Sequence, residues 1–174
     1  FLTMPTAHNP TATTLKDDRR GALVEIAERY GVTIIEWSGS IPKREGAQRP
    51  LAALAPHRTI HIADLAACAI GGLRLGIVTA PSESLDQIGR EIVSQHRQLP
   101  GLLAGLLEAL AGPGAYEAAI EVQSRLLAER RDVFRRALGE AVASLTTVET
   151  HGWLPPMPAR SWASFCFTPG TTVW

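Results

Sequence analysis

Polar and aromatic side chains follow three short apolar runs of this sequence, at the points where each run ends. His8 and Asn9 come after the first run, Trp37 and Ser38 end the second, and residues 63–68 follow the third. If the three runs are strands of a parallel sheet, their carboxyl ends meet at one edge, which is where α/β proteins bind ligands. The order of the residues therefore predicts a ligand site formed by these three loops.

The reactive side chains of the chain allow more than one interpretation. His8 could stack on a ring or transfer a proton, or it could simply be an exposed loop residue. Cys68 fits a small buried hydrophobic residue better than a catalytic thiol. No metal site is predicted from the remaining histidines, His57, His61, His96 and His151.

Strands and helices are expected to alternate in the first half of the chain. Strands are indicated by apolar or β-branched runs at residues 1–4, 32–37, 59–63 and 73–80, the first of them buried. A helix should have Asp17 and Asp18 in its first turn and end at Gly31, with one apolar face made of Leu23, Ile26, Ala27 and Tyr30. Residues 51–54 indicate a helical turn.

The second half of the chain is predicted to be mostly helical. The spacing of Leu85, Ile88 and Ile92 indicates a helix that reaches His96. A row of leucines from Leu99 to Leu110 indicates a second, very apolar helix that belongs to the core or to an interface. A long third helix is expected at residues 115–144, followed by strands at 147–150 and 161–167.

This order of elements indicates an α/β fold with a parallel sheet and crossover helices. We expect a partial large domain at residues 1–140 and the start of a small α+β C-terminal subdomain at 141–174. Both ends of the sequence are apolar, whereas natural termini are usually polar, so we expect the chain to be part of a longer protein.

The composition narrows the possible partners and compartments. Formal net charge is +0, which provides no general attraction to nucleic acid or to an anionic membrane. No run of residues is long and apolar enough to span a bilayer. The 2 cysteines give no disulfide framework, so a reducing cytoplasmic location is expected.

Four stretches of the sequence resemble one protein family. Residues 63–76, which read ADLAACAIGGLRLG, are similar to the segment SLSKCLAPGLRLG of fold type I aminotransferases. Residues 5–15 resemble the segment of class I/II aminotransferases that contains Asn-Pro-Thr, and residues 55–59 and 72–81 match the same domain. The closest resemblance is to the aminotransferase-like domain of MocR-type regulators in the GntR superfamily. It implies the three-layer large domain of fold type I proteins.

The resemblance implies pyridoxal phosphate as the cofactor and assigns roles to several residues. Asn9 matches the asparagine that hydrogen-bonds the pyridoxal ring oxygen, and Arg74 matches the arginine that holds the phosphate. His8 lies beside Asn9 in the implied cofactor loop, and Trp37 lies where the ring would be. Alternatively, Asn9 forms an Asx turn ahead of Pro10 and Arg74 forms a surface ion pair.

The residues that carry the family's chemistry are replaced in this sequence. Ala67 occupies the position of the Schiff-base lysine. The family motif E-D-D-x-Y is Glu36-Trp37-Ser38-Gly39-Ser40 here, so Trp37 replaces the aspartate that pairs with the pyridine nitrogen and Ser40 replaces the tyrosine. Asp64 and Ala66 replace serines. The remaining lysines, Lys16 and Lys43, lack the family spacing to Arg74, so no catalytic residue and no covalent cofactor are predicted.

Three functional hypotheses follow. The first is a catalytically impaired aminotransferase-like protein, in which Ala67 arose by natural decay or by engineering. The second is a non-catalytic, effector-sensing domain of a MocR-type regulator. The third is a cleft with a new activity that does not use pyridoxal phosphate, where Trp37 offers a stacking surface. The expected ligand is an amino acid or amine. A homodimer or a companion chain is expected as partner, whereas nucleic acid and membrane are not.

Overall fold

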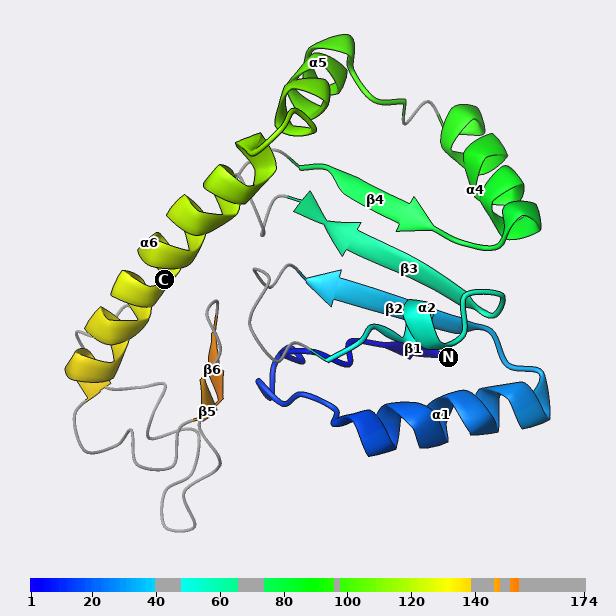
Figure 1. The fold of residues 1–174 in the computed structure, drawn as a ribbon, viewed down its shortest axis with the longest axis horizontal. Coiled ribbons are helices and arrows are strands. Elements are labelled where there is room, and N and C mark those ends of the chain that lie inside the picture. The colour runs from blue at the N-terminus through cyan, green and yellow to red at the C-terminus, as the bar shows by residue number, and fades with distance from the viewer. Residues whose placement is uncertain (40–47, 66–73, 96–97, 139–145, 148–150, 154–174) are drawn as a thin grey trace, which may run out of the picture.

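A computed structural model describes residues 1–39, 48–65, 74–95, 98–138, 146–147 and 151–153 of the chain. Its main feature is a four-stranded sheet in the order β1 (Leu2–Thr3), β2 (Ile34–Gly39), β3 (Thr59–Asp64) and β4 (Gly76–Thr79). Figure 1 shows the sheet with helices around it, and the chain thus has the expected α/β architecture. The strands predicted at 32–37 and 59–63 are confirmed with small shifts of their ends.

The predicted parallel sheet is confirmed for three strands, and the fourth strand differs from them in direction. β1, β2 and β3 are mutually parallel, but β4 runs antiparallel to β3, with Asp64 paired to Gly76 and His61 to Thr79. The Leu65 amide donates a 2.9 Å hydrogen bond to the Leu75 carbonyl, so the chain reverses directly beside the sheet. A parallel neighbour would need a crossover of a dozen or more residues, whereas an antiparallel neighbour needs only a short connection.

Helix α1 (Asp17–Tyr30) begins and ends where the sequence predicts, but a different face is buried. Gly31 ends it in the left-handed conformation, with a φ of 65°. Ala27 forms the main core with Ile34 of β2 and Leu51 of helix α2 (Leu51–Leu54), and Leu23 and Val24 pack against it. Ile26 and Tyr30 are exposed, which corrects the predicted face. The face of α1 that contacts the sheet contains residues 20, 24 and 27, so Val24 packs against the core in place of Ile26 and Tyr30.

The first strand is not buried, contrary to the expectation. Phe1 and Leu2 are 60% and 65% exposed. β1 lies at the edge of the sheet and pairs only with β2, so one of its sides has no strand neighbour within the described part of the chain. Apolar residues at an edge remain accessible because burial requires a covering element as well as an apolar sequence.

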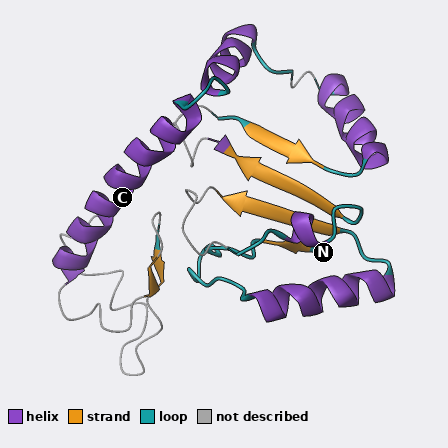
Figure 2. Ribbon diagram, in the orientation of Figure 1, coloured by secondary structure: helices purple, strands orange, loops and turns teal. Residues whose placement is uncertain are grey.

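Three helices follow the sheet: α4 (Ser82–Ser94), α5 (Gly101–Leu110) and α6 (Ala115–Leu138) (Figure 2). A second core cluster joins Leu65 at the end of β3 to Leu110 of α5, and Tyr116 and Ala119 of α6 pack against it. The predicted helices are therefore confirmed as elements, although residues 96 and 139–144 lie outside the described part. None of the described helices has both the length and the apolar character needed to cross a membrane.

The C-terminal region is described only in part. Strands β5 (Thr146–Thr147) and β6 (Gly152–Trp153) form a small antiparallel pair, and β6 was not predicted. The strand expected at 161–167 and most of the subdomain expected at 141–174 lie outside the described residues, so this domain boundary stays a prediction.

Candidate ligand site

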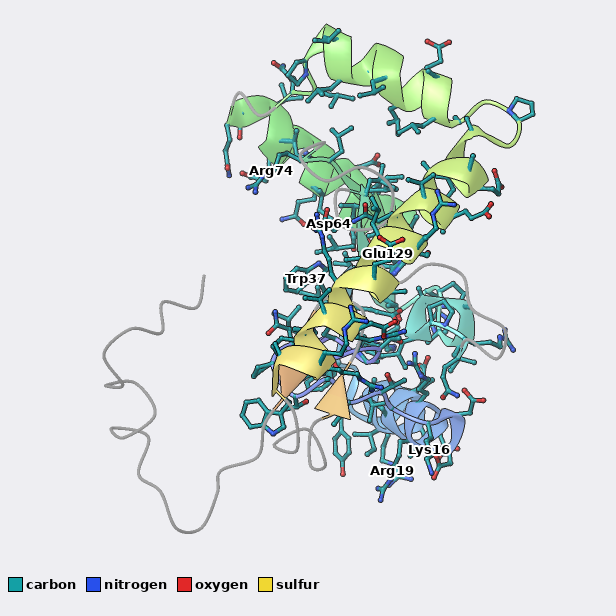
Figure 3. The ribbon with its side chains drawn as sticks, turned by 90° about the vertical axis from the view of Figure 1, so that its left-hand side faces the viewer. Lys16, Arg19, Trp37, Asp64, Arg74 and Glu129 are labelled. Atoms are coloured by element: carbon teal, nitrogen blue, oxygen red, sulfur yellow. The ribbon has the colours of Figure 1, made fainter. Side chains whose placement is uncertain are left out.

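The sheet register brings the predicted site residues to one edge. Gly39 pairs with Asp64 and Asp64 with Gly76, so β2 and β3 end where β4 begins, and β1, whose Thr3 pairs with Glu36, ends three residues earlier in the register. The loop that carries His8 and Asn9, the end of β2 and the residues just before β4 therefore share this edge. Figure 3 shows Arg74, Asp64 and Trp37 along one side of the molecule. The ligand-binding role of these residues remains a prediction.

The loop of residues 5–15, which we call the 5–15 loop, is held by its own hydrogen bonds. The His8 amide donates to the Thr13 carbonyl at 2.8 Å, and the Ala12 amide donates to the His8 carbonyl at 2.6 Å. His8 Nδ1 lies 2.8 Å from Thr11 Oγ1, so the imidazole is part of a hydroxyl network rather than simply exposed. His151 Nε2 also contacts the His8 carbonyl, at 3.1 Å, and ties the loop to a residue beside β6.

Asn9 and Arg74 are both exposed at this edge. The Asn9 amide N–H points to Met4 Sδ at 3.4 Å, and its side chain forms no Asx turn with Thr11 among the described residues. None of the ion pairs between described residues includes Arg74, and the choice between a phosphate contact and a surface ion pair stays open. Both polar groups are accessible to a ligand.

Strained backbone is concentrated at the same edge. Among the described residues, the non-glycine positions with positive φ are Ala7 at 47°, Ala12 at 56° and Arg74 at 48°. Residues with a Cβ rarely adopt this left-handed conformation, and such positions cost on the order of 1–3 kcal/mol each and tend to occur at functional sites. Two of them lie in the 5–15 loop and the third carries the candidate phosphate-binding guanidinium.

Trp37 is 43% exposed and pairs with Ile62 of β3. Its neighbour Glu36 is buried toward α1, and successive residues of a strand point to opposite faces, so the indole lies on the face away from α1. Asp64 is the last residue of β3 and is half-buried. An aromatic face and a carboxylate thus accompany Asn9 and Arg74 at this edge.

Several predicted positions lie outside the described residues: Ser40, Lys43, Ala66, Ala67 and Cys68. Lys16 is described and is exposed immediately before α1. Figure 3 shows it at the opposite end of the molecule from Arg74. The expectation that Lys16 does not replace the missing lysine stays a prediction.

A buried ion pair beside the loop was missed by the sequence analysis. Arg20 of α1 and Glu36 of β2 have 0% and 1% exposed side chains, and Arg20 Nη1 lies 3.9 Å from Glu36 Oε1. Burial lowers the pKa of Arg20, although the charges of Glu36 and Asp17 oppose this shift. Helical spacing places Arg20 on the same face as Leu23, Val24 and Ala27, but it gives no signal for the partner Glu36.

A second missed contact lies between two central strands. Ser38 Oγ and His61 Nε2 are 2.8 Å apart and partly buried. The pair is diagonal across β2 and β3, on the same face as Glu36. In the described part of the chain, no group of three His, Cys, Asp or Glu side chains is arranged to hold a metal.

Two curated relatives match most of this sequence. The HTH-type transcriptional regulator YdeF of Bacillus subtilis is 26% identical over 133 residues, which cover 76% of this chain and 29% of that protein. The HTH-type transcriptional regulator TauR of Rhodobacter capsulatus is 28% identical over 140 residues, or 79% of this chain and 29% of that protein. The chain thus spans less than a third of each relative. No family model matches it.

Several solved structures with a similar fold are aminotransferases. An archaeal alanine:glyoxylate aminotransferase superposes with a TM-score of 0.72 and 27% identity, covering 83% of this chain and 36% of that one. Kynurenine aminotransferase of Pyrococcus horikoshii superposes with a TM-score of 0.66 and 26% identity, covering 80% of this chain and 35% of that one. LysN, the α-aminoadipate aminotransferase of Thermus thermophilus, superposes with a TM-score of 0.73 and 20% identity, covering 87% of this chain and 40% of that one.

Proposed function

Because this chain has the fold of the fold type I pyridoxal phosphate aminotransferases, we propose that it is a ligand-binding domain of that type within a transcriptional regulator. In this proposal the domain holds a phosphorylated pyridoxal ligand without a covalent bond and does not transaminate. The observation that carries the proposal is that the loop with Asn9 and the residue Arg74 just before β4 both lie at the sheet edge where β2 and β3 end.

The chemistry of the side chains at this edge fits such a ligand. The planar, permanently charged guanidinium of Arg74 suits a phosphate group, and the exposed amide of Asn9 suits a ring oxygen. The exposed indole of Trp37 offers a face for an aromatic ring. When bound in an active family member, the cofactor supplies an electron sink. Ala67 and Trp37 stand at the positions of the lysine and aspartate that this chemistry requires.

The assignment to a regulator rests on the relatives. YdeF and TauR are HTH-type transcriptional regulators, whereas the structural neighbours with more than 25% identity are enzymes. A formal net charge of +0 suits a domain that senses a small molecule and leaves DNA binding to another part of the protein. We infer that the effector is an amino acid or an amine.

The test is the affinity of the full-length protein for pyridoxal 5′-phosphate and pyridoxamine 5′-phosphate, measured by calorimetry. Removing a charged hydrogen-bond donor costs about 1.5–3 kcal/mol, so Arg74→Ala should weaken binding by about 10- to 100-fold. Arg19→Ala, a change of an exposed arginine on α1, is the matched control and should leave the affinity unchanged. Equal affinities of the wild type and Arg74→Ala would exclude a phosphate site at this edge.

The exposure of Trp37 favours one second candidate, a cleft that binds an aromatic ligand without phosphate. In that case the wild type would not bind pyridoxamine 5′-phosphate, and Trp37→Ala would abolish binding of an unphosphorylated aromatic amine such as tyramine. Binding of pyridoxamine 5′-phosphate and of tyramine therefore separates the two functions. A phosphate site requires Arg74 and a phosphorylated ligand, whereas an aromatic site requires Trp37 and binds a ligand without phosphate.

A further inference from the structure

We propose that Arg20 is a positioning residue that fixes the conformation of the 5–15 loop and thereby presents Asn9 to the ligand. This proposal rests on the proposed function of the edge that Asn9 and Arg74 share. Arg20 belongs to α1, not to the loop or to the sheet edge, and its side chain is fully buried.

The guanidinium of Arg20 joins the two ends of the loop. Nη2 donates to the Pro5 carbonyl at 3.0 Å and to Thr6 Oγ1 at 2.6 Å, and Nε donates to the Leu15 carbonyl at 2.9 Å. The Leu15 amide also donates to the Pro5 carbonyl at 2.8 Å. Pro5 and Leu15 are therefore clamped together at the base of the loop, and Asn9 lies at its far end.

The same side chain ties the loop to the strand that carries Trp37. Nη1 donates to the Arg49 carbonyl at 3.0 Å and lies 3.9 Å from Glu36 Oε1. Glu36 Oε2 in turn accepts a 2.9 Å hydrogen bond from the Ala52 amide in α2. Because Glu36 directly precedes Trp37, one buried ion pair links the loop, the end of β2 and α2.

Strain in the loop explains why such a clamp is needed. Ala7 and Ala12 have φ values of 47° and 56°, in the left-handed region that alanine avoids. Strained residues persist only when the surrounding structure holds them in place. Arg20 holds the loop with four hydrogen bonds that point to different parts of the chain. The guanidinium of arginine has five N–H donors and can make all four, whereas the ammonium of lysine has only three.

The first variant is Arg20→Lys in the full-length protein, with affinity for pyridoxamine 5′-phosphate measured by calorimetry. Lysine keeps the charge next to Glu36 but cannot make all four hydrogen bonds. We expect Arg20→Lys to weaken binding by about as much as Asn9→Ala does. In the Arg20→Lys background, Asn9→Ala should then add little, whereas Arg74→Ala should still have its full effect, because Arg74 lies outside the loop.

This double-mutant comparison separates positioning from general destabilisation. If Arg20→Lys leaves the affinity unchanged, or if Asn9→Ala keeps its full effect in that background, the proposal is overturned. Arg20→Met combined with Glu36→Gln removes both buried charges together and serves as a second variant that leaves no unpaired ion. In this variant too, Asn9→Ala should have little further effect on the affinity for pyridoxamine 5′-phosphate.

Hydrogen exchange gives a readout that does not depend on the ligand. Arg20→Lys should speed exchange of the Ala12 and Leu15 amides, which are hydrogen-bonded within the loop, and should leave exchange within β3 unchanged. Unchanged loop exchange would contradict the positioning role. If the wild type does not bind pyridoxamine 5′-phosphate, the proposed function fails, and faster loop exchange would still support the structural part of the inference.

Discussion

Arg74 carries a permanent positive charge on a backbone conformation that few residues other than glycine adopt. Asn9 lies across the same sheet edge in a loop that contains two further left-handed residues, Ala7 and Ala12. Ala67 stands between these features in the sequence, at the position where the family has its reactive lysine. At the scale of single residues, the proposed function assigns Arg74 and Asn9 to hold a phosphorylated ring and leaves position 67 without a group that could react with it.

Restoring the lysine tests this interpretation. With the anchors retained, Ala67→Lys should form a link to pyridoxal 5′-phosphate that borohydride traps, and the wild type should form none. We expect little amino transfer from this variant, because Trp37 leaves the pyridine nitrogen without an anionic partner. Loss of that partner should cost several kcal/mol of barrier, on the order of 10³-fold in rate.

Adding Trp37→Asp to Ala67→Lys should then raise half-transamination sharply, measured by the change in the cofactor spectrum when amino acid is added. Peptide mapping after reduction identifies the labelled lysine. A label on Lys16 or Lys43 in the wild type would contradict the absence of a replacement lysine. Efficient transamination by the single variant would show that Trp37 does not occupy the aspartate position.

Helix α1 is the element on which the 5–15 loop depends, because it supplies Arg20 and follows the loop directly. It ends at Gly31, whose φ of 65° allows the chain to turn into β2. Near the C-terminal end of the helix, Glu28 Oε1 lies 2.7 Å from His57 Nε2, and Glu28 Oε2 lies 3.1 Å from Arg58 Nε. These contacts connect the helix to the segment between α2 and β3.

Two glycines of this region should respond to alanine in opposite directions. Nothing lies within 4 Å of a Cβ built at Gly31 or Gly21, so only backbone preference matters at either position. Gly31→Ala should destabilise the protein by about 1–2 kcal/mol, because the left-handed conformation disfavours a side chain. Gly21→Ala, inside α1, should stabilise it by about 0.5–1 kcal/mol. Urea denaturation measures both, and equal effects would refute the capping role of Gly31.

The Glu28 cluster should make stability depend on pH in the acid range. Burial raises the pKa of Glu28, but the hydrogen bond from Arg58 and the charge of His57 outweigh this, so the net pKa lies below its ordinary value. A carboxylate with a lowered folded-state pKa stabilises the protein above its unfolded-state pKa, about 4.3, and this contribution is lost as pH falls through the folded-state pKa.

Glu28→Gln should therefore lower Tm at pH 6 and reduce the further drop in Tm between pH 6 and pH 3. Glu25→Gln, on the same helix and exposed, is the control and should retain the wild-type drop. Parallel pH profiles for the wild type and Glu28→Gln would show that the cluster contributes nothing to the acid sensitivity.

At the scale of the whole molecule, the helices after the sheet expose much apolar surface. α4 contains no buried residue, and Leu85, Ile92 and Val93 are among its exposed side chains. In α5, Leu102 is 86% exposed. A formal net charge of +0 provides little repulsion between copies. Exposed apolar area of this kind is typical of surfaces that another polypeptide covers.

We therefore expect the 174-residue chain, with a monomer mass of 18.7 kDa, to self-associate in solution. Leu102→Gln should reduce the association without lowering Tm, because the side chain of Leu102 is 86% exposed. Glu108→Gln on the same helix is the control. Sedimentation equilibrium measures the mass, and a stable monomer at all concentrations would contradict the expectation.

Local signals account for the parts of the fold that the sequence predicted correctly. The acidic first turn and Gly31 delimit α1, and β-branched runs mark β2 and β3, because capping and side-chain periodicity act between residues close in the chain. The identities of Asn9, Trp37, Ala67 and Arg74 were likewise available from the sequence, and with them the expectation of a ligand site that has no reactive lysine.

The tertiary structure alone decided the remaining features, because they depend on residues far apart in the sequence. The antiparallel direction of β4 follows from its pairing with β3, and the exposure of Phe1 and Leu2 follows from their place at the sheet edge. The burial of Arg20 among Pro5, Leu15, Glu36 and Arg49 requires the 5–15 loop, the segment before α2, strand β2 and helix α1 to be in place. A charged residue on a helix is usually solvated, and only the carbonyls that surround this guanidinium make its burial stable.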